Sequence, residues 1–156
     1  MKKLINFILN LFRRKKIETV KNDYAEYQIN NFDIELFKEI NEYRRGKGLP
    51  FLEYGCEECF DIAGSHVEWL SENVSSKEDM VEKAHYYFTE REQQIKLRIK
   101  AKYVSETVAY DFRSAVGVVF AWHKSYKHNK VLNNSKFTHV VFASKDKFVI
   151  AVFYGI

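Results

Sequence analysis

Two apolar segments at the end of the chain, separated by two polar residues, constrain the fold more than any other feature. They run from Lys136 to Ser144 and from Lys147 to Gly155, and their centres read FTHVVFA and FVIAVFY. A connection as short as Lys145-Asp146 forces an antiparallel hairpin. Strands that are apolar on both faces are buried on both faces, so helices must cover the sheet on two sides. The hairpin therefore predicts an α+β fold, a three-layer α/β/α sandwich with a small central antiparallel sheet.

Helical periodicity accounts for much of the chain before the hairpin. Three helices are predicted. The first begins at an Asp33 cap and runs to about Arg45, and the second runs from about Cys56 to Glu72. The third begins at a Ser114 cap and has its apolar residues at helical spacing: Ala115, Val118, Val119, Trp122 and Tyr126. The last of these is expected to end near His128. Residues 102–110 alternate enough for a strand with Glu106 in its middle, residues 83–99 are expected to be partly helical, and residues 73–79 form a predicted polar loop.

Basic charge is concentrated at the start of the chain. Seven Lys or Arg and one Glu lie between Met1 and Lys21, which leaves 18 basic and 20 acidic residues for the rest. A domain with this balance does not carry the basic surface of a nucleic-acid-binding protein, so no nucleic-acid partner is expected. We divide the chain into an N-terminal arm (residues 1–16), a linker (17–31) and one domain (32–156).

The N-terminal arm is expected to form a basic amphipathic helix. One side would carry Leu4, Ile5, Ile8, Leu11 and Phe12, and the ends would carry Lys2, Lys3, Arg13, Arg14, Lys15 and Lys16. Such a helix can lie in a membrane interface with its basic residues on anionic headgroups, or pack on its own domain or a partner, and amphipathicity does not separate these cases. The apolar stretch is too short to cross a bilayer and unlike a cleaved signal peptide. A cytoplasmic or membrane-peripheral location is expected, with export left open.

The chain has two cysteines, Cys56 and Cys59, in the sequence Cys-Glu-Glu-Cys. A structural zinc site would need a second pair of ligands at a similar spacing, and the sequence has none. Cys59 is in helical phase with Ala63 and Leu70, which favours a small core residue over redox or metal chemistry.

Five short motifs follow one another in a fixed order. They are Asn41-Glu42-Tyr43-Arg44 with Gly48-Leu49-Pro50; His66-Val67-Glu68-Trp69-Leu70; His85 with Arg91; Glu106-Thr107-Val108-Ala109-Tyr110; and Trp122, Ser125, His128 and Leu132 before Phe137-Thr138. In this order the chain resembles the CAP superfamily, which includes cysteine-rich secretory proteins, plant pathogenesis-related proteins and bacterial SCP-like proteins. The resemblance is closest to the bacterial branch and implies an α/β/α sandwich.

The resemblance also implies a surface cleft lined by two histidines and acidic residues, which binds a divalent metal in some members. Carried over by position, the cleft residues and candidate catalytic residues are His66, Glu106 and His128. The supporting residues at the cleft are His85, Arg91, Tyr110 and Ser125. A second Glu of the plant and animal branch would fall near Ser125 and is missing here, and Thr107 replaces the usual Asn.

Two interpretations of this cleft remain open from the residues alone. Two neutral imidazoles and a carboxylate suit a zinc-like ion, with His66 and His128 as metal ligands, and they can also transfer protons near neutral pH. Alternatively, the same side chains hydrogen-bond one another and only tie the helices to the sheet.

Three functions are therefore considered. The first is a non-catalytic binding module whose cleft holds a small ligand, a peptide or a divalent ion, tethered to a surface or partner by the arm. The second is a metal-assisted, peptidase-like hydrolase that uses the same cleft, with zinc as its candidate cofactor. The third is a structural component of a viral or envelope assembly, because the Lys-, Asn- and Ile-rich composition is typical of AT-rich microbial and phage genomes.

Overall fold

The computed structural model describes residues 30–156, and the N-terminal arm with most of the linker lies outside the described residues. The described helices are α2 (Asn31–Gly46), α3 (Glu57–Asn73), α4 (Lys77–Lys83), α5 (Phe88–Ile99), α6 (Ala115–Lys124) and α7 (Tyr126–Leu132). The strands are β1 (Glu53–Tyr54), β2 (Tyr103–Tyr110), β3 (His139–Lys145) and β4 (Phe148–Gly155). No helix in this part of the chain combines the length and apolar character needed to span a membrane.

The sheet has the strand order β1-β3-β4-β2, with β4 inside and β2 at one edge. β3 and β4 form the predicted antiparallel hairpin, and β2 pairs antiparallel to the other side of β4. Every residue of β4 is buried, which explains its continuous apolar sequence. One feature was not predicted: the two-residue strand β1 pairs parallel to β3, with Glu53 opposite His139.

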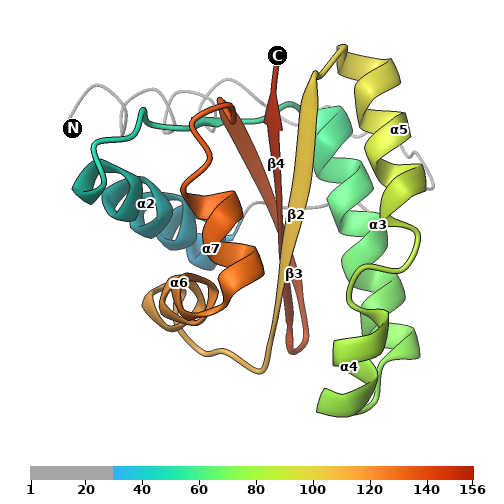
Figure 1. Ribbon diagram of the computed structural model, residues 1–156. Helices are drawn as coiled ribbons and strands as arrows, with labels where there is room; N and C mark the ends of the chain where they lie inside the picture. Colours follow the sequence, from blue (N-terminus) through green and yellow to red (C-terminus); the bar gives the residue numbers. More distant parts are fainter. Residues whose placement is uncertain (1–29) are drawn as a thin grey trace, which may run out of the picture.

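Helices cover both faces of the sheet, as the hairpin predicted. Figure 1 shows α2, α6 and α7 on one side and α3, α4 and α5 on the other, with β2 in front between the two layers. Each layer has its own core: Trp122, Phe142 and Phe153 belong to the first, and Leu70 and Ile150 belong to the second. The three-layer α+β sandwich is thereby confirmed.

Two helix boundaries differ from the predictions for local reasons. Asn30, not Asp33, caps α2, and Asp33 is the third helical residue of a capping box in which Asn30 Oδ1 accepts from the Asp33 amide at 2.9 Å. Short α4 begins at Lys77 inside the predicted polar loop, because the Ser76 hydroxyl accepts from the amide of Asp79 and caps it.

A third difference changes the position of the site. The apolar ladder through Tyr126 predicted one continuous helix, but Ser125 is extended and separates α6 from α7. Tyr126 is consequently 75% exposed and does not belong to the core. The break lets α7 pack beside β2, so His128 approaches the sheet edge from a helix of its own.

Buried polar side chains of α2 hold the chain that enters and leaves the sheet. Asn41 exchanges two hydrogen bonds with the backbone of Leu52, just before β1. The fully buried Arg44 donates to the carbonyl oxygens of Pro50, Leu132 and Asn134. The Asn-Glu-Tyr-Arg motif therefore has a structural role, since it satisfies backbone groups that would otherwise be buried without partners.

Candidate functional site

Glu106 is the centre of a buried charge network beside the edge strand. It lies in the middle of β2, is 5% exposed, and faces the layer that contains α5. Arg91 of α5 donates from Nη2 to Glu106 Oε1 at 2.6 Å and from Nε to Oε2 at 3.1 Å. Such a two-bond arrangement is the strong geometry for an Arg–carboxylate pair, and it offsets the cost of burying both charges.

His85 is the third member of this network. It lies in the turn between α4 and α5, and its Nδ1 is 2.9 Å from Glu106 Oε1. The carboxylate of Glu106 is almost fully buried, whereas the His85 side chain is 47% exposed. Burial by itself would raise the pKa of Glu106, but the hydrogen bonds from His85 and Arg91 and the charge of Arg91 outweigh it, and the pKa is lowered. Glu106 is therefore ionised at neutral pH.

His66 lies beneath this network and holds the turn that presents His85. Its Nε2 donates to the carbonyl oxygen of Ala84 at 2.8 Å, and its ring stacks on Trp69 at a centroid distance of 6.0 Å. Burial, followed by the nearby charge of Arg91, lowers the pKa of His66, so the ring is neutral at pH 7. Arg91 fastens the same turn through a bond from Nη1 to the Tyr86 carbonyl.

The backbone of this turn is itself constrained. Tyr87 has φ of 60°, in the left-handed region that a large aromatic residue rarely adopts. Bonds from His66 and Arg91 to the carbonyl groups of Ala84 and Tyr86, on either side of His85, hold the segment that leads into Tyr87. The position of His85 is thus set by two buried side chains that do not themselves face the solvent.

His128 approaches the network from the opposite helix layer. Its ring centroid is 6.2 Å from that of His85 and 6.4 Å from the ring of Trp122. Burial, and then the charges of His85 and Lys127, lower the pKa of His128 to about 4. A neutral imidazole thus lies between the two helix layers at physiological pH.

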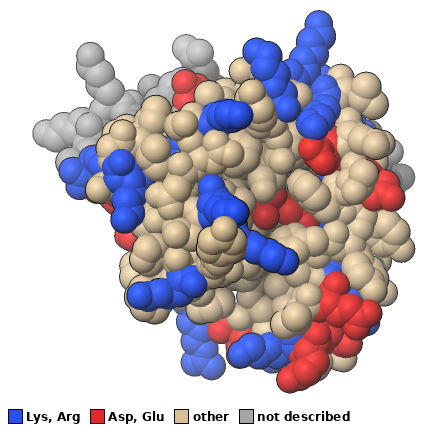
Figure 2. Space-filling model, in the orientation of Figure 1, with Lys and Arg blue, Asp and Glu red and all other residues tan. Residues whose placement is uncertain are grey.

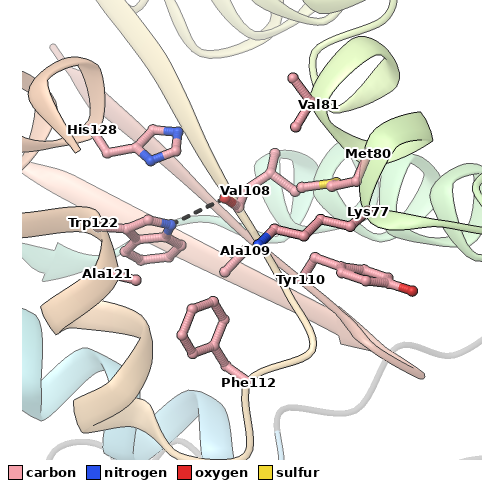
Figure 3. Close-up of a pocket in the computed structure, with 10 residues that line it drawn as sticks. All are labelled: Lys77, Met80, Val81, Val108, Ala109, Tyr110, Phe112, Ala121, Trp122 and His128. Atoms are coloured by element: carbon pink, nitrogen blue, oxygen red, sulfur yellow. Dashed lines mark hydrogen bonds between the residues drawn. The ribbon is translucent and has the colours of Figure 1, made fainter. Parts of the chain in front are cut away.

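Two cavities lie along β2, each with a volume of about 250 Å³, and both are lined by His128. The first, here called the polar cavity, is lined by His85, Phe88, Ser105, Glu106, Lys127, His128 and Val131. The second, here called the apolar cavity, is lined by Lys77, Met80, Val81, Val108, Ala109, Tyr110, Phe112, Ala121, Trp122 and His128. Figure 3 shows the second, with the indole of Trp122 bonded to the backbone of Val108 and His128 beside it.

The candidate site residues do not all meet in one place. Glu106, His85 and His128 line the polar cavity, Tyr110 lines the apolar cavity, and Arg91 supports Glu106 from behind. His66 is buried and lines neither cavity. Ser125 also lies outside both linings; its backbone joins α6 to α7 by accepting from the Asn129 amide at 2.8 Å.

The proposed metal set of His66, Glu106 and His128 does not fit a metal ion. Both carboxylate oxygens of Glu106 bind Arg91, and Nε2 of His66 is used by Ala84. Across residues 30–156, no three His, Cys, Asp or Glu side chains are close enough together to hold one. Because these side chains already have partners within the protein and do not converge on one point, we derive no metal-assisted chemistry from this cleft.

Sequence reasoning missed several lining residues, among them Lys127, Val131, Phe112 and Lys77. Lys127 and Val131 are four residues apart and share a face of α7, so a helical period starting at Tyr126 would have found them. No signal in the sequence indicated that Lys77 lies near Phe112, because α4 was expected to be a loop.

Comparisons with known proteins agree with the fold and the motifs. The fold described above places the chain in the class of three-layer α/β/α sandwich domains. The model of the CAP family, described as the cysteine-rich secretory protein family, matches residues 37–147, and the chain belongs to this family. A comparison with curated protein sequences gives no match.

Solved structures show the same fold at low sequence identity. A cysteine-rich secretory protein from Staphylococcus aureus has a TM-score of 0.66 and 22% identity, over 90% of this chain and 43% of that one. An extracellular protein containing an SCP domain from Bacillus anthracis has a TM-score of 0.69 and 20% identity, over 90% and 45%. An outer surface protein from Borrelia burgdorferi has a TM-score of 0.66 and 21% identity, over 84% and 98%. The chain thus spans less than half of the first two proteins.

Proposed function

We propose that this CAP domain is a non-catalytic binding module that holds an extended peptide segment along the outer edge of β2. The observation that carries the proposal is that both cavities are lined by residues of β2 and share His128 as a lining residue. Together they form a groove between the two helix layers. A groove of this kind suits an elongated ligand better than a compact one.

Unpaired backbone groups of β2 support this ligand class. The Asp111 amide donates to the Lys147 carbonyl, and the ladder register then directs the amides of Glu106, Val108 and Tyr110 away from β4. An extended peptide can hydrogen-bond to such groups by adding a strand to the sheet. The Val108 carbonyl already accepts from Trp122 Nε1 at 3.2 Å, which leaves the outward amides as the main contacts for a peptide.

Charge complementarity indicates an acidic peptide. Lys77 lines one cavity and Lys127 lines the other, whereas the only carboxylate in either lining, Glu106, is already compensated by Arg91. Figure 2 shows Lys and Arg side chains near the middle of this face, beside acidic atoms that lie deeper. The preferred ligand would place apolar side chains against Phe112 and Trp122 and carboxylates near the two lysines.

The proposal is tested by selecting linear decapeptides from a display library against the full chain. The selected peptides should be acidic and should protect the outward amides of Glu106 and Tyr110 from hydrogen exchange. Lys127→Glu should weaken their binding at least tenfold, whereas the matched control Lys38→Glu, on the exposed side of α2, should not. Peptides that bind both variants equally and protect no β2 amide would refute the proposal.

For the N-terminal arm we propose that residues 1–16 tether the domain to an anionic membrane surface. The support is its basic and apolar composition, since the arm lies outside the described residues. Deletion of residues 1–16 should abolish binding to vesicles of phosphatidylglycerol and leave thermal unfolding of the domain unchanged. Retained vesicle binding would exclude the tether, and loss of a stable oligomer in place of vesicle binding would favour the structural-assembly alternative.

A further inference from the structure

The two cysteines lie together at the start of α3, away from the groove that we propose for ligands. Cys56 is the N-cap residue and Cys59 is the third residue of the 17-residue helix. Both are free thiols, and their Sγ atoms are 3.6 Å apart. We infer that this Cys-Glu-Glu-Cys segment is a dithiol–disulfide redox site that exchanges with external disulfides.

The two thiols are unequal in a way that assigns their roles. Cys56 is partly exposed, whereas Cys59 is fully buried in the core of its layer. Burial, and then the neighbouring Cys56, raise the pKa of Cys59, so its thiol stays protonated and cannot be reached by a reagent. Cys56 is therefore the sulfur that attacks first, and Cys59 is the resolving sulfur.

The backbone at Cys56 is held in place before any reaction. Its amide donates to Oη of the buried Tyr154 at 3.0 Å, and the Gly55 amide donates to the Val140 carbonyl at 2.9 Å. A Cβ at position 55 would come within 2.8 Å of both Val141 and Tyr154, so only glycine lets the segment lie this close to the sheet. The two Sγ atoms, 3.6 Å apart, must approach one another to form a bond of about 2.05 Å.

Glu58 supplies a proton acceptor beside the attacking sulfur. Its own backbone amide and the Cys56 thiol both hydrogen-bond the carboxylate, and together they lower the pKa of Glu58. As the S–H bond breaks, the proton can pass to this carboxylate and then to water.

The reaction balances with an external disulfide as the oxidant. Cys56 sulfur attacks one sulfur of R–S–S–R, forming a Cys56–S–S–R bond while the first R–S⁻ leaves and takes a proton. Cys59 sulfur then attacks Cys56 sulfur as its own proton passes to the departing second R–S group, which forms the Cys56–Cys59 disulfide and releases R–SH. The net change oxidises two thiols to one disulfide and reduces one R–S–S–R to two R–SH.

The test equilibrates the full chain in buffers of reduced and oxidised glutathione, followed by acid quench, maleimide labelling and intact mass measurement. The wild type should lose two hydrogens and both maleimide sites without gaining glutathione. Cys59→Ala, which keeps the core position apolar, should stop at one stable glutathione adduct. Cys56→Ser, which keeps a good N-cap residue, should form neither product.

Other results would overturn the inference. They are two free thiols in the wild type at every buffer ratio, a persistent glutathione adduct in the wild type, or a disulfide between two chains. Circular dichroism on each variant ensures that Cys59 has not become accessible through unfolding. Glu58→Gln gives an independent check, since it should slow the first step several-fold and leave the equilibrium between dithiol and disulfide unchanged.

Discussion

The polar cavity and the apolar cavity lie along the same strand, share His128 and have the same volume, but different interactions hold their walls in place. In the polar cavity, the wall depends on the ion pair of Glu106 with Arg91 and on the bond from His85. In the apolar cavity, the wall is made of packed side chains, and Trp122 makes its single hydrogen bond to a backbone carbonyl.

This difference indicates which lining residues can be substituted without loss of stability. A buried charge network is stable only while every partner is present, because removal of one leaves a desolvated charge. Truncation of an apolar lining residue lowers the free energy of unfolding in proportion to the buried apolar area that is removed. Truncation of an exposed residue at the rim changes it very little. The polar cavity is therefore the rigid end of the proposed groove, and at the apolar cavity the lining residues can change at little cost in stability.

The largest effect should come from breaking the buried pair. Arg91→Ala leaves the Glu106 charge buried without its partner and should lower the free energy of unfolding by about 3–5 kcal/mol at pH 7. Urea denaturation measures this. The control Lys96→Ala removes a more exposed partner of Glu92 on the same helix and should cost less than about 1 kcal/mol.

A double substitution sharpens this first prediction. Arg91→Met combined with Glu106→Gln removes both charges, so it should cost clearly less than the sum of the two single changes. Additive costs would show that the pair is not coupled and that the polar wall is held by packing, as the apolar wall is.

The next effect is a dependence of stability on pH that arises from the shared histidine. The folded-state pKa of His128, about 4, lies below its ordinary value of 6.5, so the unfolded chain binds the proton first as the pH falls. Its contribution, on the order of 2–3 kcal/mol, is complete above pH 6.5 and is lost as the pH falls to about 4. His66, whose pKa is also lowered, adds to the slope in the same direction.

Comparison of the wild type with His128→Gln isolates the shared histidine. The difference between their free energies of unfolding should change across the window from pH 6.5 to about 4 and stay constant above it. Glu106 acts at lower pH, because the stability gained from a lowered carboxyl pKa is lost only as the pH falls below the ordinary value of 4.5. Parallel curves for the two proteins would contradict the buried, neutral state of His128.

The smallest effect on stability is expected at the rim of the apolar cavity. Val81 is 81% exposed, so Val81→Ser should change the free energy of unfolding by less than about 0.5 kcal/mol. The same change should weaken the decapeptides selected against the wild type several-fold, which titration calorimetry can measure. A clear loss of thermal stability with unchanged peptide affinity would contradict the conclusion that the apolar cavity tolerates substitution.

The sequence predicted the sheet and its two layers because those features follow from local rules. The short turn at Lys145-Asp146 between two apolar strands allowed only an antiparallel hairpin, which β3 and β4 form. The predicted Ser114 cap of α6 is also present. The break at Ser125 could not be predicted in the same way. Tyr126 continues the helical ladder of α6, and only the space beside β2 makes a separate α7 the better arrangement.

The candidate site was less predictable, for a physical reason that His85 illustrates. Sequence spacing places Glu106 on a strand and Arg91 on a helix, but it does not say which imidazole reaches the carboxylate. His85 does so from a turn whose shape depends on the left-handed Tyr87 and on bonds from two buried side chains. Such positions are set by tertiary contacts, and the helical or strand periodicity of the sequence does not predict them.

An exposed edge strand can pair with other sheets, and β2 lies at one edge of this sheet. Here the helix layers rise on both sides of the strand, and the Trp122 indole covers the carbonyl in its middle. In the proposed function a single peptide chain lies between these layers, whereas a second folded sheet would meet the helices before it met the backbone. A domain with the proposed function would thereby combine a peptide-binding edge with protection against open-ended polymerisation.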